Sequence, residues 1–223
     1  SWFRSSSRFR RRARWEPEDA GTMRCTRGPA WTNATTRSLA LERIDGFLVN
    51  AAAITNGPGE NLGTYVGTIA TDGTPDCNMM FNPAPAAGGA ANRLDVWNCY
   101  NRVDVKSTNI DNSGTWNYDA SAYRAKNNNI NNAIIWVTGL TEDCFRATNV
   151  IVGVQSTTTT LGCASIGLDS STARHAQAIN SNSTSLATGW EAMHATLALN
   201  SPLGRHFVCP LEQGFAGVGD IAW

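Results

Sequence analysis

The residue types best suited to chemistry are spread singly along this chain. Its three histidines and six cysteines form no CxxC, no HExxH and no other short pairing typical of a metal site. The nearest approach is His206 with Cys209, three positions apart in an apolar segment, and we interpret both as buried packing residues. The sequence therefore predicts no metal site and no cofactor.

Adjacent carboxylates occur at Glu142–Asp143 and at Glu18–Asp19. Neighbouring residues on a strand point to opposite faces, whereas glycosidase chemistry needs two carboxyl groups that converge across about 5–10 Å. A loose glycine motif at 214–219 follows no strand–helix unit, so it is read as a turn rather than a nucleotide loop. We predict no catalytic residue and expect that the protein is not an enzyme.

The first 14 residues contain six arginines and no acid. The whole chain has 18 basic and 18 acidic residues, so 12 basic residues face 18 acidic ones elsewhere, a net charge of −6. Like charges and few apolar side chains prevent such a segment from folding alone, and we expect a partner to order it. The residues of this predicted basic arm are Trp2, Arg4, Arg8, Phe9, Arg10, Arg11, Arg12 and Arg14.

Two kinds of partner fit the basic arm. The favoured one is an acidic neighbouring subunit, including the body of the next copy of this chain. The alternative is nucleic acid, because arginines neutralise phosphates and aromatic side chains stack on bases. Arginine suits both partners, so the composition does not choose between them.

The composition predicts the fold class of the remaining chain. Charged residues make up 16% of the whole chain, and Asn, Thr, Ser, Gly and Ala carry much of its length, which argues against a helical bundle. No apolar run approaches the roughly 18 residues that cross a bilayer, so we expect a soluble chain with no membrane partner. We expect an extended basic arm and connector over 1–36 and one all-β domain over 37–223.

Strand signals recur about every ten residues in this body. The strongest lie at 133–140, 147–155 and 161–168, each rich in Val and Ile, and weaker ones at 62–71, 92–106 and 115–125. Residues 38–54 fit two strand pieces joined at Gly46, residues 206–223 fit two short strands, and 189–200 fits either helix or strand. This spacing predicts a jelly-roll-like β-sandwich of eight or more strands.

Aromatic and arginine side chains recur at fixed separations in two of these segments. NRLDVWNCYNRVDV at 92–105 and TWNYDASAYRAKNNNINNAIIWVTGLTEDC at 115–144, together with LGTYVGTIATDG at 62–73 and SIGLDSS at 165–171, cover about half of the chain. In these stretches the sequence resembles a group of tailed-bacteriophage virion structural proteins, namely head-fibre, decoration or tail-associated β-proteins. The candidate interface residues that we carry forward are Trp97, Tyr100, Arg102, Trp116, Tyr118 and Arg124.

The resemblance implies a β-sandwich module assembled on a virion, and the group offers no catalytic residues to carry over. We expect a non-enzymatic capsid decoration, head-fibre or tail-associated subunit. It would be made in the host cytoplasm, assemble with copies of itself as a trimer, and contact capsid or tail proteins. Two alternatives stay open: a module that binds host-surface glycan, and a jelly-roll capsid protein whose arm binds nucleic acid.

Overall fold

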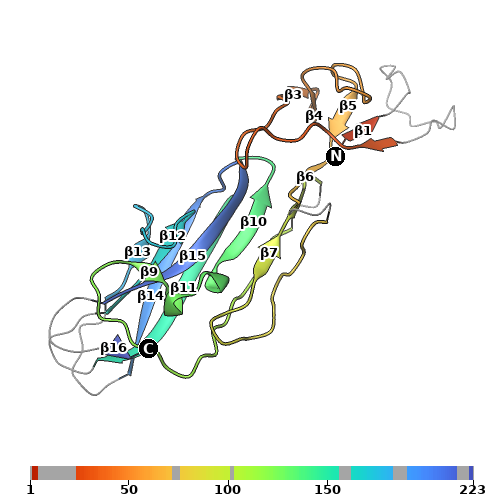
Figure 1. Cartoon of the computed structure of the whole chain (residues 1–223). Helices are drawn as coiled ribbons and strands as arrows, with labels where there is room; N and C mark the ends of the chain where they lie inside the picture. The colour runs from red at the N-terminus through yellow and green to blue at the C-terminus, as the bar shows by residue number, and fades with distance from the viewer. Residues whose placement is uncertain are drawn as a thin grey trace.

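The computed structural model describes residues 2–4, 24–71, 76–100, 103–155, 162–182, 190–214 and 221–222. Within these ranges the regular structure is β-strand, apart from two short 3-10 turns, η1 (Lys126–Asn128) and η2 (Ile130–Asn132). The predicted all-β class is confirmed. Figure 1 shows an elongated molecule with a small sheet at one end and longer strands in the body.

Five strands form the end sheet, in the order β2-β1-β5-β4-β3. They are β1 (Trp2–Arg4), β2 (Arg24–Thr26), β3 (Leu41–Ile44), β4 (Phe47–Asn50) and β5 (Gly63–Tyr65). Strands β3 and β4 form a hairpin whose two loop residues, Asp45 and Gly46, have φ angles of 48° and 87°. A tight two-residue hairpin loop requires positive φ at both positions. The two strand pieces predicted to meet at Gly46 are confirmed.

The start of the predicted arm differs from the sequence-based expectation. Trp2–Arg4 pair antiparallel with β2 on one side and with β5 on the other, so the chain itself orders these three residues. Pairing on both sides satisfies the backbone N–H and C=O groups of these residues. The sequence-based prediction considered only the side-chain charges and not this backbone pairing. Strand β2 likewise places part of the predicted connector in this sheet. The other arm residues, Arg8, Phe9, Arg10, Arg11, Arg12 and Arg14, lie outside the described residues.

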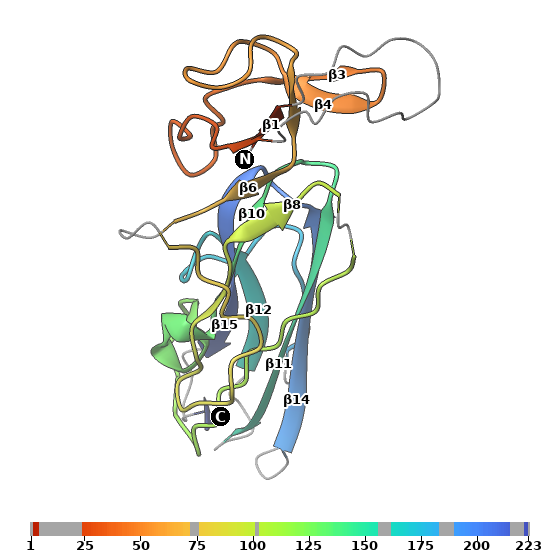
Figure 2. The ribbon, with the colours of Figure 1, turned by 90° about the vertical axis from the view of Figure 1, so that its right-hand side faces the viewer.

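The body contains two larger sheets, ordered β12-β15-β10-β7 and β13-β14-β11-β16, and a two-stranded pair, β6-β8. The bounds are β6 (Gly67–Ile69), β7 (Asn92–Leu94), β8 (Val96–Asn98), β9 (Arg124–Ala125), β10 (Ile134–Thr138), β11 (Cys144–Gln155), β12 (Gly162–Leu168), β13 (Ile179–Asn180), β14 (Trp190–Asn200), β15 (Gly204–Gly214) and β16 (Ile221–Ala222). Strand β9 pairs with β15 beside the first sheet. The long pair β11–β14 runs along the body in Figure 2.

One hydrophobic cluster joins the two larger sheets. Ile166 of β12 and Val208 of β15 pack with Ile151 of β11 and with Met193 and Leu197 of β14. Along β14 the buried apolar residues Met193, Ala195 and Leu197 stand at every second position, as expected for a strand that turns one face to a core. Burial of these apolar side chains therefore joins the two sheets.

The three strongest predicted strands are confirmed as β10, β11 and β12, and 189–200 is resolved as strand β14. Alternate burial of Met193, Ala195 and Leu197 explains this outcome, because partner strands on both sides favour extended backbone over the local helix propensity.

Four predicted strands differ from the structure. The segment 62–71 is divided at Val66 into β5 of the end sheet and β6, which pairs with β8. The segment 92–106 is divided at Asp95 into β7, which pairs parallel with β10, and β8, which pairs with β6. Only Arg124–Ala125 of 115–125 form a strand, since the side chains of this segment bind β15 without a continuous backbone ladder. The C-terminal segment forms one 11-residue strand, β15, and the two-residue β16, not two similar short strands. None of the described residues belongs to a helix long and apolar enough to cross a membrane.

Candidate functional site

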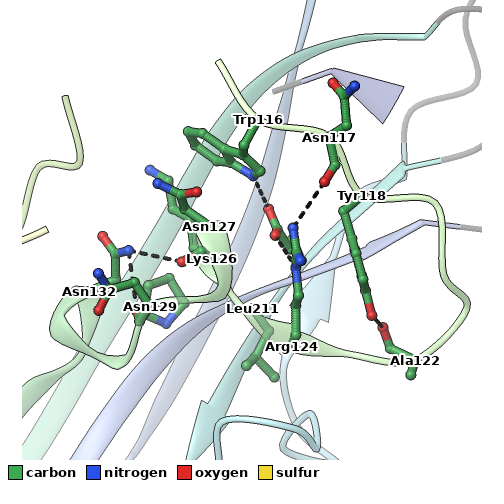
Figure 3. A network of polar contacts seen from close by, with 12 residues as sticks. Trp116, Asn117, Tyr118, Ala122, Arg124, Lys126, Asn127, Asn129, Asn132 and Leu211 are labelled. Atoms are coloured by element: carbon green, nitrogen blue, oxygen red, sulfur yellow. Dashed lines mark hydrogen bonds and ion pairs between the residues drawn. The ribbon is translucent and has the colours of Figure 1, made fainter. Parts of the chain in front are cut away.

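A fully buried glutamate, Glu212 on β15, gathers three of the predicted interface residues around it. Arg124 Nε donates to Glu212 Oε1 over 2.6 Å, and the Trp116 indole Nε1 donates to Oε2 over 2.7 Å. The Arg124 guanidinium lies 3.8 Å from the centre of the Tyr118 ring and donates to the Asn117 carbonyl (Figure 3). The structure therefore brings Trp116, Tyr118 and Arg124 into one arrangement, the Glu212 cluster.

Burial controls the electrostatics of this cluster. Burial raises the pKa of Glu212, and the hydrogen bonds from Trp116 and Arg124 act in the opposite direction. Lys126 lies 5.9 Å from the centre of the Trp116 ring, and burial lowers the pKa of its ammonium group. A carboxylate withdrawn from water is tolerated when both oxygens are hydrogen-bonded and a cation is adjacent, and Glu212 meets both conditions.

The Glu212 cluster ties the irregular segment 116–126 to β15. Arg124 is paired with Glu212 through its Nε, and Tyr118 Oη donates to the Ala122 carbonyl over 2.6 Å. The polar atoms of the three predicted residues are thus engaged within the chain. An interface role for their exposed edges stays a prediction.

A second tryptophan–carboxylate contact lies near the end sheet. Trp97 Nε1 on β8 donates to Asp143 Oδ2 over 2.6 Å, and the Trp97 ring stacks on Tyr65 with centroids 6.0 Å apart. A Cβ atom on Gly139 would overlap both rings, so this position requires glycine. We call these four residues the Trp97 cluster.

Of the two remaining predicted interface residues, Tyr100 lies within the described part of the chain. Tyr100 is 62% exposed, and burial raises the pKa of its phenol. Arg102 lies outside the described residues. The six candidate residues therefore do not form one surface, because Trp97 and Trp116 serve two different clusters.

The Asp111 carboxylate, which the sequence analysis did not identify, holds together the loops beside the Glu212 cluster. Asp111 Oδ1 accepts from the backbone N–H of Gly88 and of Ser113, and Oδ2 accepts from Asn127 and Asn132 at 3.0 and 3.2 Å. Burial alone would raise the pKa of Asp111, but these hydrogen bonds outweigh it and hold the pKa well below its usual range. This carboxylate therefore helps to order the polar run 126–132, through Asn127 and Asn132.

The side chains of His206 and Cys209 lie in different surroundings. His206 is buried, and its ring bonds Asp169 through Nδ1 at 2.6 Å and the Leu203 carbonyl through Nε2 at 3.0 Å. Burial raises the pKa of the Cys209 thiol to about 12, so the residue acts as a small apolar side chain. Both residues are buried, as predicted. The described residues contain no group of three or more His, Cys, Asp and Glu side chains that could hold a metal ion.

The outer face of the β11–β14 pair presents apolar side chains to solvent. Val150 and Val152 of β11 are 45% and 50% exposed, Trp190 of β14 is 62% exposed, and Ile179 of β13 is 74% exposed. The register pairs Val152 with Ala192 and Val150 with His194, so the apolar positions of neighbouring strands share this face. We call this surface the outer face.

The outer face could have been found from the sequence. The run Val150–Val154 is apolar at nearly every position, whereas a strand with one solvated face normally alternates apolar and polar residues. Such a run indicates burial on both sides. In the described chain, one side meets the core and the other meets solvent.

Comparison with protein-family models, with curated proteins and with solved structures finds no match to this chain.

Proposed function

We propose that the protein is a non-enzymatic structural subunit of a tailed-bacteriophage virion that assembles with copies of itself through the outer face. The observation that carries the proposal is the exposed apolar surface of Val150, Val152, Ile179 and Trp190. Exposed large apolar side chains that gather on one face of a sheet are typical of protein–protein contact surfaces. A protein neighbour would remove this surface from water.

A second copy of this chain is the partner that the outer face fits. Among the outward positions of β11 and β14 in the described chain, Arg146 carries the one permanent charge, at the end away from Trp190. Two such faces can meet without burying unpaired charges, whose desolvation would oppose association. Closed symmetry would limit the assembly, and a trimer is the state that we propose.

The strand order supports the jelly-roll part of the proposal. Strands β10, β15 and β12 are neighbours in one sheet, and β11, β14 and β13 are neighbours in the other, with every one of these pairs antiparallel. The chain crosses between the sheets after β10, β11, β12 and β14. This order matches six of the eight strands of a jelly roll, an architecture that occurs in viral shells, and it supports that part of the proposal.

The sequence resemblance to head-fibre, decoration and tail-associated proteins supports a place for this subunit on a virion. In the proposal, the basic arm beyond β1 attaches the β body to the underlying capsid or tail proteins. Since Trp2–Arg4 belong to the end sheet, deleting the first 14 residues would also remove a strand. The arm is better tested by changing Arg8, Arg10, Arg11, Arg12 and Arg14 to serine together.

The decisive experiment measures the molar mass of the purified full chain by sedimentation over a range of concentrations. We expect an oligomer in the unaltered protein and a folded monomer after Val150→Glu with Val152→Glu. The control is Val103→Glu, since Val103 is 68% exposed and lies outside this face. An unaltered protein that sediments as a monomer at every concentration would refute self-assembly.

The virion role has its own test. The five-serine variant should fold and oligomerise but should no longer join particles when supplied during assembly. Full incorporation would overturn tethering by the arm. Binding of the unaltered arm to nucleic acid, with an affinity that falls steeply with salt, would favour the capsid alternative.

A further inference from the structure

A cavity of about 340 Å³ lies between the end sheet and the body. Its walls come from the segment 27–39, from 65–71, and from single residues of β10 and β15. This volume is within the usual range of small-molecule sites. The cavity shares no residue with the outer face, so an inference about it does not depend on how the protein assembles.

Three arginines line this cavity, and no acidic residue lines it with them. Arg27 is exposed, and in the described part of the chain its guanidinium makes no hydrogen bond or ion pair. Arg205 is partly balanced by Asp95, at 3.6 Å, which lies outside the lining. The site therefore carries a net positive charge that the surrounding described residues do not neutralise.

Arg37, one of the residues that line the cavity, is held in place by two aromatic rings and a backbone carbonyl. Its guanidinium lies 5.3 Å from the centre of the Trp31 ring and 5.1 Å from that of Tyr65, and Nη2 donates to the Gly139 carbonyl. Its Nε is buried and has no hydrogen-bond partner among the described residues. Within the described chain, this buried donor leaves the positive charge of Arg37 without a compensating acceptor at Nε on the protein side of the cavity wall.

The cavity wall is fixed by close backbone packing. The backbone N–H of Arg205 donates to the backbone carbonyl of Ala34 over 2.9 Å. Gly204 has a φ of 116°, and a Cβ there would overlap Ala34 and Thr35. The start of β15 and the segment at Ala34 therefore approach more closely than any residue with a side chain at position 204 would allow. A preorganised wall lowers the entropy cost of binding.

The lining defines the chemical class of the ligand. Guanidinium groups bind carboxylates through paired N–H donors, and the Thr71 hydroxyl and the Asn33 amide NH₂ add groups that bond hydroxyls. Arg37 already occupies a face of both Trp31 and Tyr65, which does not favour a stacked nucleobase. We propose that this cavity binds an acidic sugar, a carboxylate carried on a hydroxyl-bearing ring.

Calorimetric titration of the full chain tests this site, with glucuronate as the probe, glucose as its neutral match and inorganic phosphate as the small anion. We expect saturable binding of glucuronate, with glucose and phosphate at least about tenfold weaker, since each lacks one half of the recognised chemistry. Phosphate binding as tight as glucuronate would overturn the sugar assignment. Absence of glucuronate binding at millimolar concentration would overturn the site.

Variants place the binding in the cavity. Arg27→Gln should weaken glucuronate binding about fivefold without changing the unfolding curve, because this side chain has no structural partner in the described chain. Arg174→Gln, an exposed arginine outside both the cavity and the outer face, is the matched control and should bind as the unaltered protein does. Equal losses in both variants would show attraction by overall charge and would refute the site. Sedimentation of the same samples reports self-assembly separately, so either proposal can fail alone.

Discussion

The Glu212 cluster and the Trp97 cluster use the same contact in different surroundings. In each, an indole N–H donates to a carboxylate, over 2.7 Å to Glu212 and 2.6 Å to Asp143. Glu212 is completely buried and paired with Arg124, whereas Asp143 is only partly buried. The two hydrogen bonds therefore differ in energy although their lengths are similar, because the buried carboxylate has lost more of its hydration than the partly exposed one.

The two clusters also differ in what they join. The Glu212 cluster fixes an irregular segment to a strand of the main core, and the Trp97 cluster packs the body against Tyr65 of the end sheet. Losing the first should affect the whole body, and losing the second should affect mainly the contact between body and end sheet. Four measurements can separate these expectations.

Glu212→Ala should have the largest effect. It leaves the Arg124 guanidinium and the Trp116 N–H without their buried acceptor, a change that costs about 3–5 kcal/mol of folding free energy. Denaturant unfolding gives this value. Glu142→Ala is the control, because that exposed pair with Arg43 should be worth less than about 1 kcal/mol. Equal losses for the two variants would contradict the role of burial.

Gly139→Ala should have the next largest effect, about 1–3 kcal/mol, because the added methyl group overlaps Trp97 and Tyr65. Gly114→Ala is the matched control, since nothing lies within 4 Å of a Cβ at that position. Thermal unfolding followed by tryptophan fluorescence compares the two variants. If both unfold together with the unaltered protein, the Trp97 cluster is looser than described.

Asp143→Ala should cost about 1 kcal/mol, the usual value of one partly exposed hydrogen bond. Its fluorescence should shift toward that of solvated indole, because Trp97 loses an acceptor. Asp104→Ala, at an exposed position, provides the baseline. A loss as large as that of Glu212→Ala would remove the distinction between the clusters.

The smallest effect is a pH dependence of stability that belongs to Glu212. Because burial raises its folded-state pKa above 4.5, the folded protein binds this proton more tightly than the unfolded chain does. This contribution is fully present below pH 4.5 and is lost as the pH rises through the raised value. Subtracting the stability curve of Glu212→Gln isolates it. A difference that grows with pH in this range would reverse the sign and contradict the prediction.

Local patterns predicted a large part of the fold. Runs of Val and Ile identified β10, β11 and β12, and the Asp45–Gly46 pair marked the β3–β4 hairpin. The same patterns failed at 92–106, where alternation continues across the break at Asp95, because pairing partners and not side-chain order decide where a strand changes sheet.

The candidate residues were predicted less completely than the fold. Aromatic and arginine spacing pointed to Trp97, Trp116, Tyr118 and Arg124, but it gave no sign that Glu212, 88 residues from Arg124, would be their common centre. Asp111 was missed for the same reason, since its four donors come from three separate segments. Contacts between distant segments leave no periodic signal in a sequence.

By itself, the sequence determined the all-β class, the main strands and the separation of a basic N-terminal segment from an acidic remainder. These features follow from short-range preferences and from counting charges. Only the tertiary structure decided that Trp2–Arg4 join a sheet, that a glutamate is the centre of the aromatic cluster, and that three arginines surround one cavity. Burial and long-range pairing fix such features, and both depend on the packing of the whole chain.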